Sequence, residues 1–227
     1  MVDLNRKVFY DSVRHSLFGG ALRQSQVDGM EALIDDFERV AIDTRWFAYV
    51  LATAFHETAQ TMEPIEEYGR GRGRSYGVPD PQTHQTYYGR GFVQLTHKKN
   101  YETMGRLIGV DLVNHPELAL NADNATKIIF AGMEQGLFTG KKLKDYFDDS
   151  HSDWYNARRI VNGLDRAARI AGYGVEFYKA ILTSLKAAPT ESLAPPDRIA
   201  EARAREPMQD DDWSIDSEAQ YLLNVDV

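Results

Sequence analysis

The chain has 227 residues, 43% of them apolar, and contains no cysteine. This length is sufficient for one substantial core, while the missing cysteines exclude a disulfide framework, a thiolate metal site and a thiol nucleophile. They also favour a protein made in a reducing cytosol. The N-terminal residues lack the apolar region of a signal peptide, and no stretch approaches membrane-spanning length. We therefore expect a protein without a membrane span, made in the cytoplasm without a cleavable signal.

The formal net charge of −8 is concentrated at the C-terminal end. Residues 187–227 hold ten acidic and three basic side chains, whereas the preceding 186 residues hold 24 and 23. The body is thus nearly neutral and lacks the basic stripe of a nucleic-acid-binding protein. We predict two parts: a catalytic domain over residues 1–186, and an acidic, proline-containing tail over residues 187–227. The apolar end of that tail is suited to docking on a partner or on the body, and a solvated tail is the alternative.

Hydrophobic spacing predicts a mostly helical body. Residues 26–40 have helical spacing, and a second helix begins with Asp43 or Thr44 as N-cap and runs to Phe55. This second helix is apolar around most of its circumference, so we expect it to be central and buried. Residues 69–81 are rich in glycine and proline and predict a loop. We also expect a strand near 87–95 and helices near 98–108, 121–136, 141–147, 152–161 and 165–186.

Glu57 is the first candidate for chemistry. It shares a helix face with Val50 and Ala54, and therefore lies at the margin of the core. Burial favours the protonated form of a carboxylic acid, which is the form that a general acid needs. An exposed Glu at a helix C-terminus is the alternative, although the helix dipole disfavours a negative charge there.

Glu66 and Glu67 supply a second carboxylate. In a continuous helix Glu66 would lie roughly 13 Å from Glu57 along the axis, on the opposite face. Pro64 ends the helix, so the chain can fold back and place either residue across a cleft from Glu57. Glycosidic-bond hydrolysis needs such a pair, one to protonate the leaving oxygen and one to activate water. The alternative is a pair of loop charges partnered by arginines at 70, 72 or 74.

The segment 87–96 predicts a polar and aromatic strand. Tyr87 and Tyr88 offer aromatic faces for sugar rings, and Gln94 and Thr96 share one face of the strand, so both can point into one cleft. Thr96 is placed to hold the attacking water. An ordinary hairpin strand with tyrosines in the core is the alternative.

A polar cluster follows near residue 162. Asn162, Asp165, Arg166 and Arg169 fall near one face if this segment is helical, although Gly163 interrupts it. Such a cluster can support a carboxylate or bind substrate, and a surface salt-bridge array is equally compatible with the pattern.

Several of these segments together resemble the family 19 glycoside hydrolases. They are the His-Glu-Thr of residues 56–58, the segment 87–96, Asn100 with Tyr101, and the Ile-Gly-Val-Asp-Leu of residues 108–112. Residues 161–163 and 177–179 match later family positions, so the resemblance extends over roughly residues 45–183. It is closest to the bacterial and phage endolysin branch rather than to the disulfide-bearing plant chitinases.

The resemblance implies a mainly α, lysozyme-like fold with two helical lobes around a cleft and a small β-hairpin. It makes Glu57 the general acid and Thr96 the water-holding residue. For the second carboxylate, Glu67 is the first choice and Glu66 the alternate. It also implies substrate-binding positions at His56, Tyr87, Tyr88, Gln94, Asn100, Asn162 and Arg169. The loop between Glu57 and Tyr87 is shorter than in the plant enzymes, which leaves chitin specificity open.

We therefore expect an enzyme that cleaves β-1,4 bonds between N-acetylmuramic acid and N-acetylglucosamine in peptidoglycan by an inverting mechanism. Release by a holin, or delivery as a toxin into a competitor's periplasm, would bring it to the wall. A chitinase acting on chitin oligosaccharides and a catalytically inactive wall-binding module are the alternatives. A zinc amidase is disfavoured because no His-Glu-x-x-His spacing occurs. No metal and no organic cofactor is expected.

Overall fold

The computed structural model describes residues 3–40 and 42–185, which form six α-helices and a two-stranded sheet. The predicted mainly α class with a small hairpin is confirmed. The helices are α1 (Arg6–Ser16), α2 (Gln24–Val40), α3 (Thr44–Glu57), α4 (Lys98–Ile108), α5 (Ala122–Gln135) and α6 (Ala167–Ser184). The strands are β1 (Ile65–Glu66) and β2 (Arg90–Gly91), and short 3-10 helices lie at η1 (Ser75–Gly77), η2 (Pro116–Leu120), η3 (Leu143–Asp145) and η4 (Asn156–Ile160). The tail and its expected docking lie outside the described residues.

Helix α3 is the buried centre that its sequence predicts. Every residue from Phe47 to Phe55 is buried, and the Asp43 side chain caps the helix by accepting from the backbone N–H of Arg45. The Phe55 ring meets Tyr173 and Phe177 of α6 edge to face, with ring centroids 4.8 and 5.9 Å apart. Burial of one such aromatic side chain stabilises the fold by about 1.5–3 kcal/mol. The packing of α3 on α6 therefore fixes where the C-terminal end of α3, and Glu57 with it, is held.

Helix α1 was not predicted, because its apolar signal is weak. Only Phe9 and Val13 are buried along its 11 residues. The helix is fixed instead by its first residues: the Asn5 side chain caps it, and the Asn5 backbone N–H donates to the Ser184 carbonyl at 2.8 Å. Its place against α6 depends on these long-range contacts, which local spacing does not reveal.

The predicted strand over residues 87–95 is wrong. Only Arg90 and Gly91 form a strand, which pairs antiparallel with Ile65 and Glu66. The backbones of Arg90 and Leu95 exchange hydrogen bonds of 3.2 and 2.8 Å, so the chain between them folds into a tight turn. Gly91 and Gln94 adopt positive φ angles of 88° and 55° within it, a conformation incompatible with an extended strand.

Two predicted helices are also wrong in extent. The segments 141–147 and 152–161 contain only the single 3-10 turns η3 and η4, and the helix expected from residue 165 begins at Ala167. The Asp148 carboxylate accepts from the backbone N–H groups of Ser150 and His151. Such local side-chain bonds compete with helix formation and favour turns.

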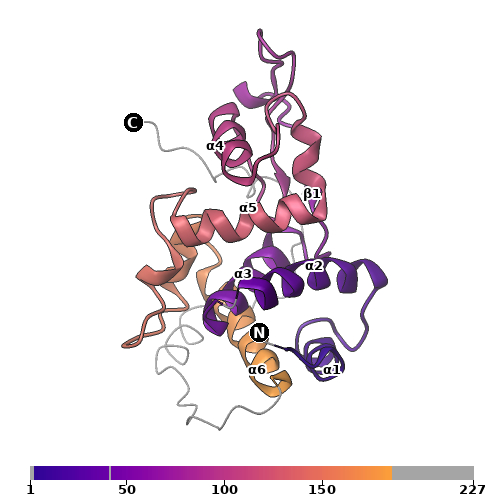
Figure 1. The fold of residues 1–227 in the computed structure, drawn as a ribbon, viewed down its shortest axis with the longest axis vertical. Coiled ribbons are helices and arrows are strands. Elements are labelled where there is room, and N and C mark those ends of the chain that lie inside the picture. Colours follow the sequence, from indigo (N-terminus) through magenta and orange to yellow (C-terminus); the bar gives the residue numbers. More distant parts are fainter. Residues whose placement is uncertain (1–2, 41, 186–227) are drawn as a thin grey trace.

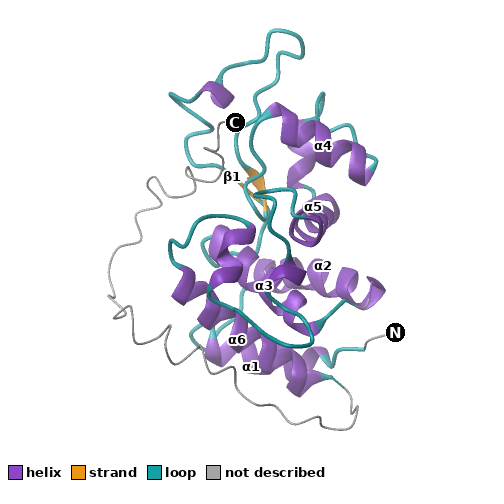
Figure 2. Cartoon of the chain, turned by 90° about the vertical axis from the view of Figure 1, so that its left-hand side faces the viewer, coloured by secondary structure: helices purple, strands orange, loops and turns teal. Residues whose placement is uncertain are grey.

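Figures 1 and 2 show the elements gathered towards two ends of the molecule. Helices α1 and α6 lie at one end, α4 and the long loop between β1 and β2 lie at the other, and α5 crosses between them. The β1–β2 pair stands at this crossing. Among the described residues, none of the helices is long and apolar enough to cross a membrane.

Candidate active site

Glu57, the last residue of α3, forms a buried ion pair with Arg158 of η4. The Arg158 Nη1 atom donates to Glu57 Oε1 at 2.6 Å, and the two side chains are only 5% and 4% exposed. The Nε atom of Arg158 donates to the Asp165 carbonyl at 3.2 Å, which fixes the guanidinium plane. Sequence reasoning predicted desolvation of an isolated acid, whereas the structure gives Glu57 a cationic partner 101 residues away.

His56 precedes this pair and is half-buried. Burial lowers the pKa of its imidazole, the neighbouring Glu57 carboxylate opposes that shift, and the positive charges of Arg158 and Arg169 add to it. His56 therefore favours its neutral form near neutral pH. The substrate-binding role expected for His56 stays a prediction.

Both carboxylate oxygens of Glu67 accept a hydrogen bond. Oε2 accepts from the Gly89 backbone N–H at 3.0 Å, and Oε1 accepts from the Tyr76 hydroxyl at 3.2 Å. The backbone N–H of Glu67 in turn donates to the Gly89 carbonyl at 2.7 Å. Burial, with the adjacent Glu67 charge, raises the pKa of Tyr76 to about 12, so this hydroxyl remains a donor. Glu67 is thus a buried, oriented carboxylate without an arginine partner in any described contact.

Glu66 has a different environment. Its Oε2 forms an ion pair with Arg70 Nη2 at 2.7 Å, and its Oε1 accepts from the Tyr88 hydroxyl at 2.7 Å. Its side chain is 30% exposed. Glu66 is therefore a loop charge paired with an arginine, which is the alternative that the sequence left open for Glu66 and Glu67. The geometry therefore favours Glu67 over Glu66 as the second carboxylate.

Gln94 connects Glu67 to the turn of residues 90–95. Its Nε2 atom donates to the Ile65 carbonyl at 3.1 Å, and a side chain added at Gly89 would meet Gln94 Oε1 at 2.7 Å and Glu67 Cβ at 3.3 Å. Gly89 therefore has to be glycine for Glu67 and Gln94 to approach it this closely. Gln94 is 3% exposed, so the protein fixes its position before any ligand binds.

Thr96 and Asn100 are linked to Gln94 by two consecutive hydrogen bonds. The Thr96 hydroxyl donates to the Gln94 carbonyl at 2.7 Å, and Asn100 Nδ2 donates to the Thr96 carbonyl at 2.8 Å. A small hollow is lined by these residues and by apolar neighbours from two other segments. The lining residues are Val93, Gln94, Leu95, Thr96, Asn100, Phe138 and Val161.

Neither Glu57 nor Glu67 lines this hollow, although two of its lining residues lie next to residues that contact them. Val161 directly follows η4, the 3-10 helix that carries the Arg158 partner of Glu57. Gln94 lies close to Gly89, whose backbone N–H donates to Glu67. That Glu57 and Glu67 face each other across a cleft stays a prediction.

Tyr87 and Tyr88 are both buried. The Tyr87 hydroxyl donates to the Val113 carbonyl at 2.9 Å, and the Tyr88 ring lies under the Arg90 guanidinium at 3.6 Å from its centroid. Both rings pack against protein, which is the core role that the sequence analysis kept as the alternative to sugar stacking.

The expected helical face over residues 162–169 is wrong. Asn162 lies before α6, where its side-chain oxygen accepts from the Gly163 backbone N–H at 2.7 Å, and only Arg169 lies within the helix. Arg166 adopts a left-handed conformation with φ of 55° at the N-cap of α6. The Asn162 backbone N–H donates to the Arg158 carbonyl at 2.9 Å, so Asn162 lies next to η4.

Sequence reasoning missed two residues of this region, Arg158 and Tyr76. Arg158 lies four residues before the Asn162 that carried the family resemblance, but no local spacing connects it to Glu57. Tyr76 falls in the glycine-rich loop, where only a loop was predicted. Both are linked to their carboxylates by contacts that a single sequence does not encode locally.

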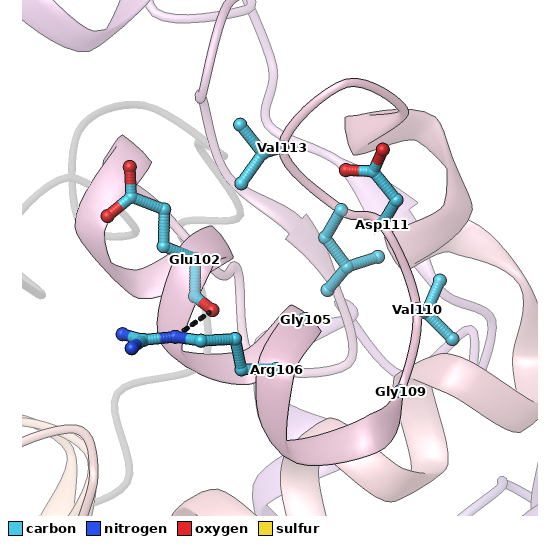
Figure 3. A pocket seen from close by; sticks show the side chains of 8 residues that line it. Glu102, Gly105, Arg106, Gly109, Val110, Asp111 and Val113 are labelled. Atoms are coloured by element: carbon cyan, nitrogen blue, oxygen red, sulfur yellow. Dashed lines mark hydrogen bonds between the residues drawn. The ribbon is translucent and has the colours of Figure 1, made fainter.

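A larger hollow of about 530 Å³ lies elsewhere, between the C-terminal end of α4 and the segment 109–113 (Figure 3). It is lined by Glu102, Gly105, Arg106, Gly109, Val110, Asp111, Leu112 and Val113. The Arg106 side chain lies along α4 and donates to the Glu102 carbonyl at 3.3 Å. None of the candidate site residues lines this hollow. Within residues 3–40 and 42–185, no group of three or more His, Asp or Glu side chains is placed to hold a metal ion.

Residues 66–176 match the family model described as chitinase class I. Glu57 lies outside this match, which begins at Glu66. Among curated proteins, the chain is 39% identical over 90 residues to acidic endochitinase Q of Nicotiana tabacum, covering 39% of this chain and 33% of the relative. It is 62% identical over 32 residues to chitinase 11 of Oryza sativa subsp. japonica, covering 14% of this chain and 12% of the relative. The chain thus spans at most about a third of the length of these relatives.

The fold is similar to that of chitinase C from Streptomyces griseus HUT6037. The TM-score is 0.51 with 18% sequence identity, and the alignment covers 82% of this chain and 79% of that one. This likeness supports the lysozyme-like architecture implied by the sequence resemblance.

Proposed function

We propose that this chain hydrolyses β-1,4 glycosidic bonds between N-acetylated hexosamine units, because residues 66–176 match the family model described as chitinase class I. The observation that carries the proposal is the pair of buried, differently held carboxylates. Glu57 is fixed by Arg158 at the end of α3, and Glu67 is fixed by a backbone N–H and a tyrosine beside β1. Glycoside hydrolysis needs one carboxyl group as acid and one as base.

Glu57 acts as the general acid. Arg158 donates to Oε1, so a protonated Glu57 carries its proton on Oε2, the oxygen left free of this contact to face the leaving group. Once the proton has been transferred, the resulting carboxylate forms a charge-assisted pair with Arg158. Arg158 thus orients the acid before the reaction and stabilises its ionised form afterwards.

Glu67 acts as the base. Each oxygen accepts a single described hydrogen bond, so each retains a lone pair able to take a proton from water. Thr96 supports that water. Its hydroxyl donates its hydrogen to the Gln94 carbonyl, so the hydroxyl oxygen can accept a hydrogen bond from the water. Attack from the face opposite Glu57 inverts the anomeric carbon.

Peptidoglycan is the proposed substrate, cleaved between N-acetylmuramic acid and N-acetylglucosamine, and chitin oligosaccharides are the second candidate. The second is favoured by the relatives, which are named endochitinases and chitinases. For the peptidoglycan role we propose that the enzyme reaches the wall through a holin or another delivery system, as an endolysin or as a toxin acting on competitors.

Incubating the protein with purified peptidoglycan and, separately, with chitin oligosaccharides tests the proposal. Mass spectrometry identifies the new reducing end: a muramic acid end means muramidase action, and a new N-acetylglucosamine end from chitin means chitinase action. Glu57→Gln protein is the matched control. If neither glycan is cleaved while the wild-type protein binds peptidoglycan, the chain is a wall-binding module and the proposed hydrolysis is wrong.

A further inference from the structure

One exposed aromatic side chain directly follows the candidate base. Tyr68 is 77% exposed, whereas every other tyrosine, phenylalanine and tryptophan in residues 3–40 and 42–185 is buried or half-buried. Within these residues, the Tyr68 side chain makes no hydrogen bond and no ring contact. Single exposed apolar residues are common on protein surfaces. The position of Tyr68 next to Glu67, rather than its exposure alone, points to a ligand.

A closed turn holds the backbone of Tyr68. The Glu67 carbonyl accepts from the Arg70 backbone N–H at 3.0 Å, and Gly69 adopts a φ of 87°, which a type II turn needs at its third residue. The ion pair between the side chains of Glu66 and Arg70, at 2.7 Å, spans the same turn. Tyr68 therefore stands at the corner of a turn that is fixed by a backbone hydrogen bond and by an ion pair.

The Tyr68 ring is within reach of a sugar bound at Glu67. The Cα atoms of neighbouring residues lie about 3.8 Å apart, so the ring is anchored beside the candidate base. The residues expected to offer aromatic faces to sugars, Tyr87 and Tyr88, are both buried and pack against protein. Tyr68 is thus an aromatic residue next to this carboxylate with its ring open to a ligand.

We propose that the Tyr68 ring stacks on an N-acetylglucosamine ring next to the cleaved bond and so strengthens binding of the glycan strand. This inference rests on the proposed function. A hexosamine ring has an apolar C–H face, and a tyrosine offers a large, rigid ring surface at a low cost in conformational entropy. Both candidate glycans contain N-acetylglucosamine, so the contact applies to peptidoglycan and to chitin.

Binding of the full chain carrying Glu57→Gln, which leaves the glycan uncut, tests the proposal. The Kd is measured on the hexasaccharide of N-acetylglucosamine and on soluble glycan strands of peptidoglycan. In this parent, Tyr68→Ala removes the ring, and Tyr68→Phe keeps the ring and removes only the hydroxyl. Val78→Ala is the matched control, at an apolar residue that is 63% exposed. Melting curves verify that each variant is folded.

Tyr68→Ala is expected to weaken binding about three- to tenfold, because a sugar that covers one face of the ring buries roughly half of the side chain. Tyr68→Phe and Val78→Ala stay within about twofold of the parent, since the ring face is kept in both. An unchanged Kd for Tyr68→Ala on both glycans would overturn the inference. So would a loss for Tyr68→Phe or for Val78→Ala that equals the loss for Tyr68→Ala.

Hydrolysis by the wild-type protein is scored separately. Cleavage of either glycan, together with an unchanged Kd for Tyr68→Ala, overturns the stacking role and leaves the proposed function standing. Weakened binding of Tyr68→Ala, when the wild-type protein cleaves neither glycan, refutes the hydrolysis and leaves the contact standing. If the parent binds neither glycan, the stacking role is wrong and the hydrolysis is judged by cleavage alone.

Discussion

Replacing Arg158 with methionine tests the buried ion pair that positions the candidate acid. The change keeps most of the apolar volume and removes the charge opposite Glu57. Since both side chains are 5% exposed or less, the carboxylate is left in the interior without its partner. Breaking such a pair from one side costs about 3–5 kcal/mol. At roughly 2–4 °C per kcal/mol for a domain of this size, the melting temperature should fall by roughly 6–20 °C.

A double-mutant cycle measures the interaction free energy between Glu57 and Arg158 separately from the contacts that each makes with other residues. Glu57→Gln should destabilise less than Arg158→Met, because the amide oxygen still accepts from the guanidinium. The double variant should be more stable than the sum of the single changes predicts, by about 0.5–3 kcal/mol. The assay is denaturant unfolding with the four proteins at one pH. Additive effects within about 0.5 kcal/mol would refute the coupling of Arg158 to Glu57 on which the acid assignment depends.

Three further predictions concern the second carboxylate, a loop ion pair and the tail. Glu67→Gln should lower glycan hydrolysis about 10²–10⁴-fold, and Glu66→Gln far less; equal losses would cancel the choice of Glu67. Lys98 lowers the pKa of Asp80 from 3.8 to about 2, so the carboxylate stabilises the fold above pH 3.8 and this contribution is lost as the pH falls towards 2. Asp80→Asn should therefore lower the melting temperature at pH 7 and lose its effect near pH 2; an unchanged difference would contradict the assignment. Truncation after Lys186 should leave a folded, active enzyme, and a large fall in melting temperature would show that the tail packs on the body.

The sequence predicted the elements whose signals are local. Helix α5 follows Asn121, whose side chain caps it, and ends at Gly136 in a left-handed conformation with φ of 75°, so both of its ends are encoded by single residues. The same holds for the Asp43 cap of α3 and for the burial of its apolar face. The candidate carboxylates were predicted in the same way, from a helix end and a proline break.

The rest depends on contacts between distant residues. The pair of Glu57 with Arg158 spans 101 residues, and no periodicity in either segment signals it. The strand expected over residues 87–95 failed because alternation of residue types does not reveal positive φ angles at Gly91 and Gln94. The helix expected near residues 141–147 is reduced to the 3-10 helix η3, and local hydrogen bonds to Asp148 favour a turn directly after it.

The stereochemistry of the first product tests the central claim most directly. If Glu67 activates water on the face opposite Glu57, proton NMR of the earliest product released from a soluble oligosaccharide of peptidoglycan or chitin shows the α-anomer. A β-anomer formed first would mean retention, and would contradict the scheme in which one carboxylate protonates the leaving oxygen and the other activates water.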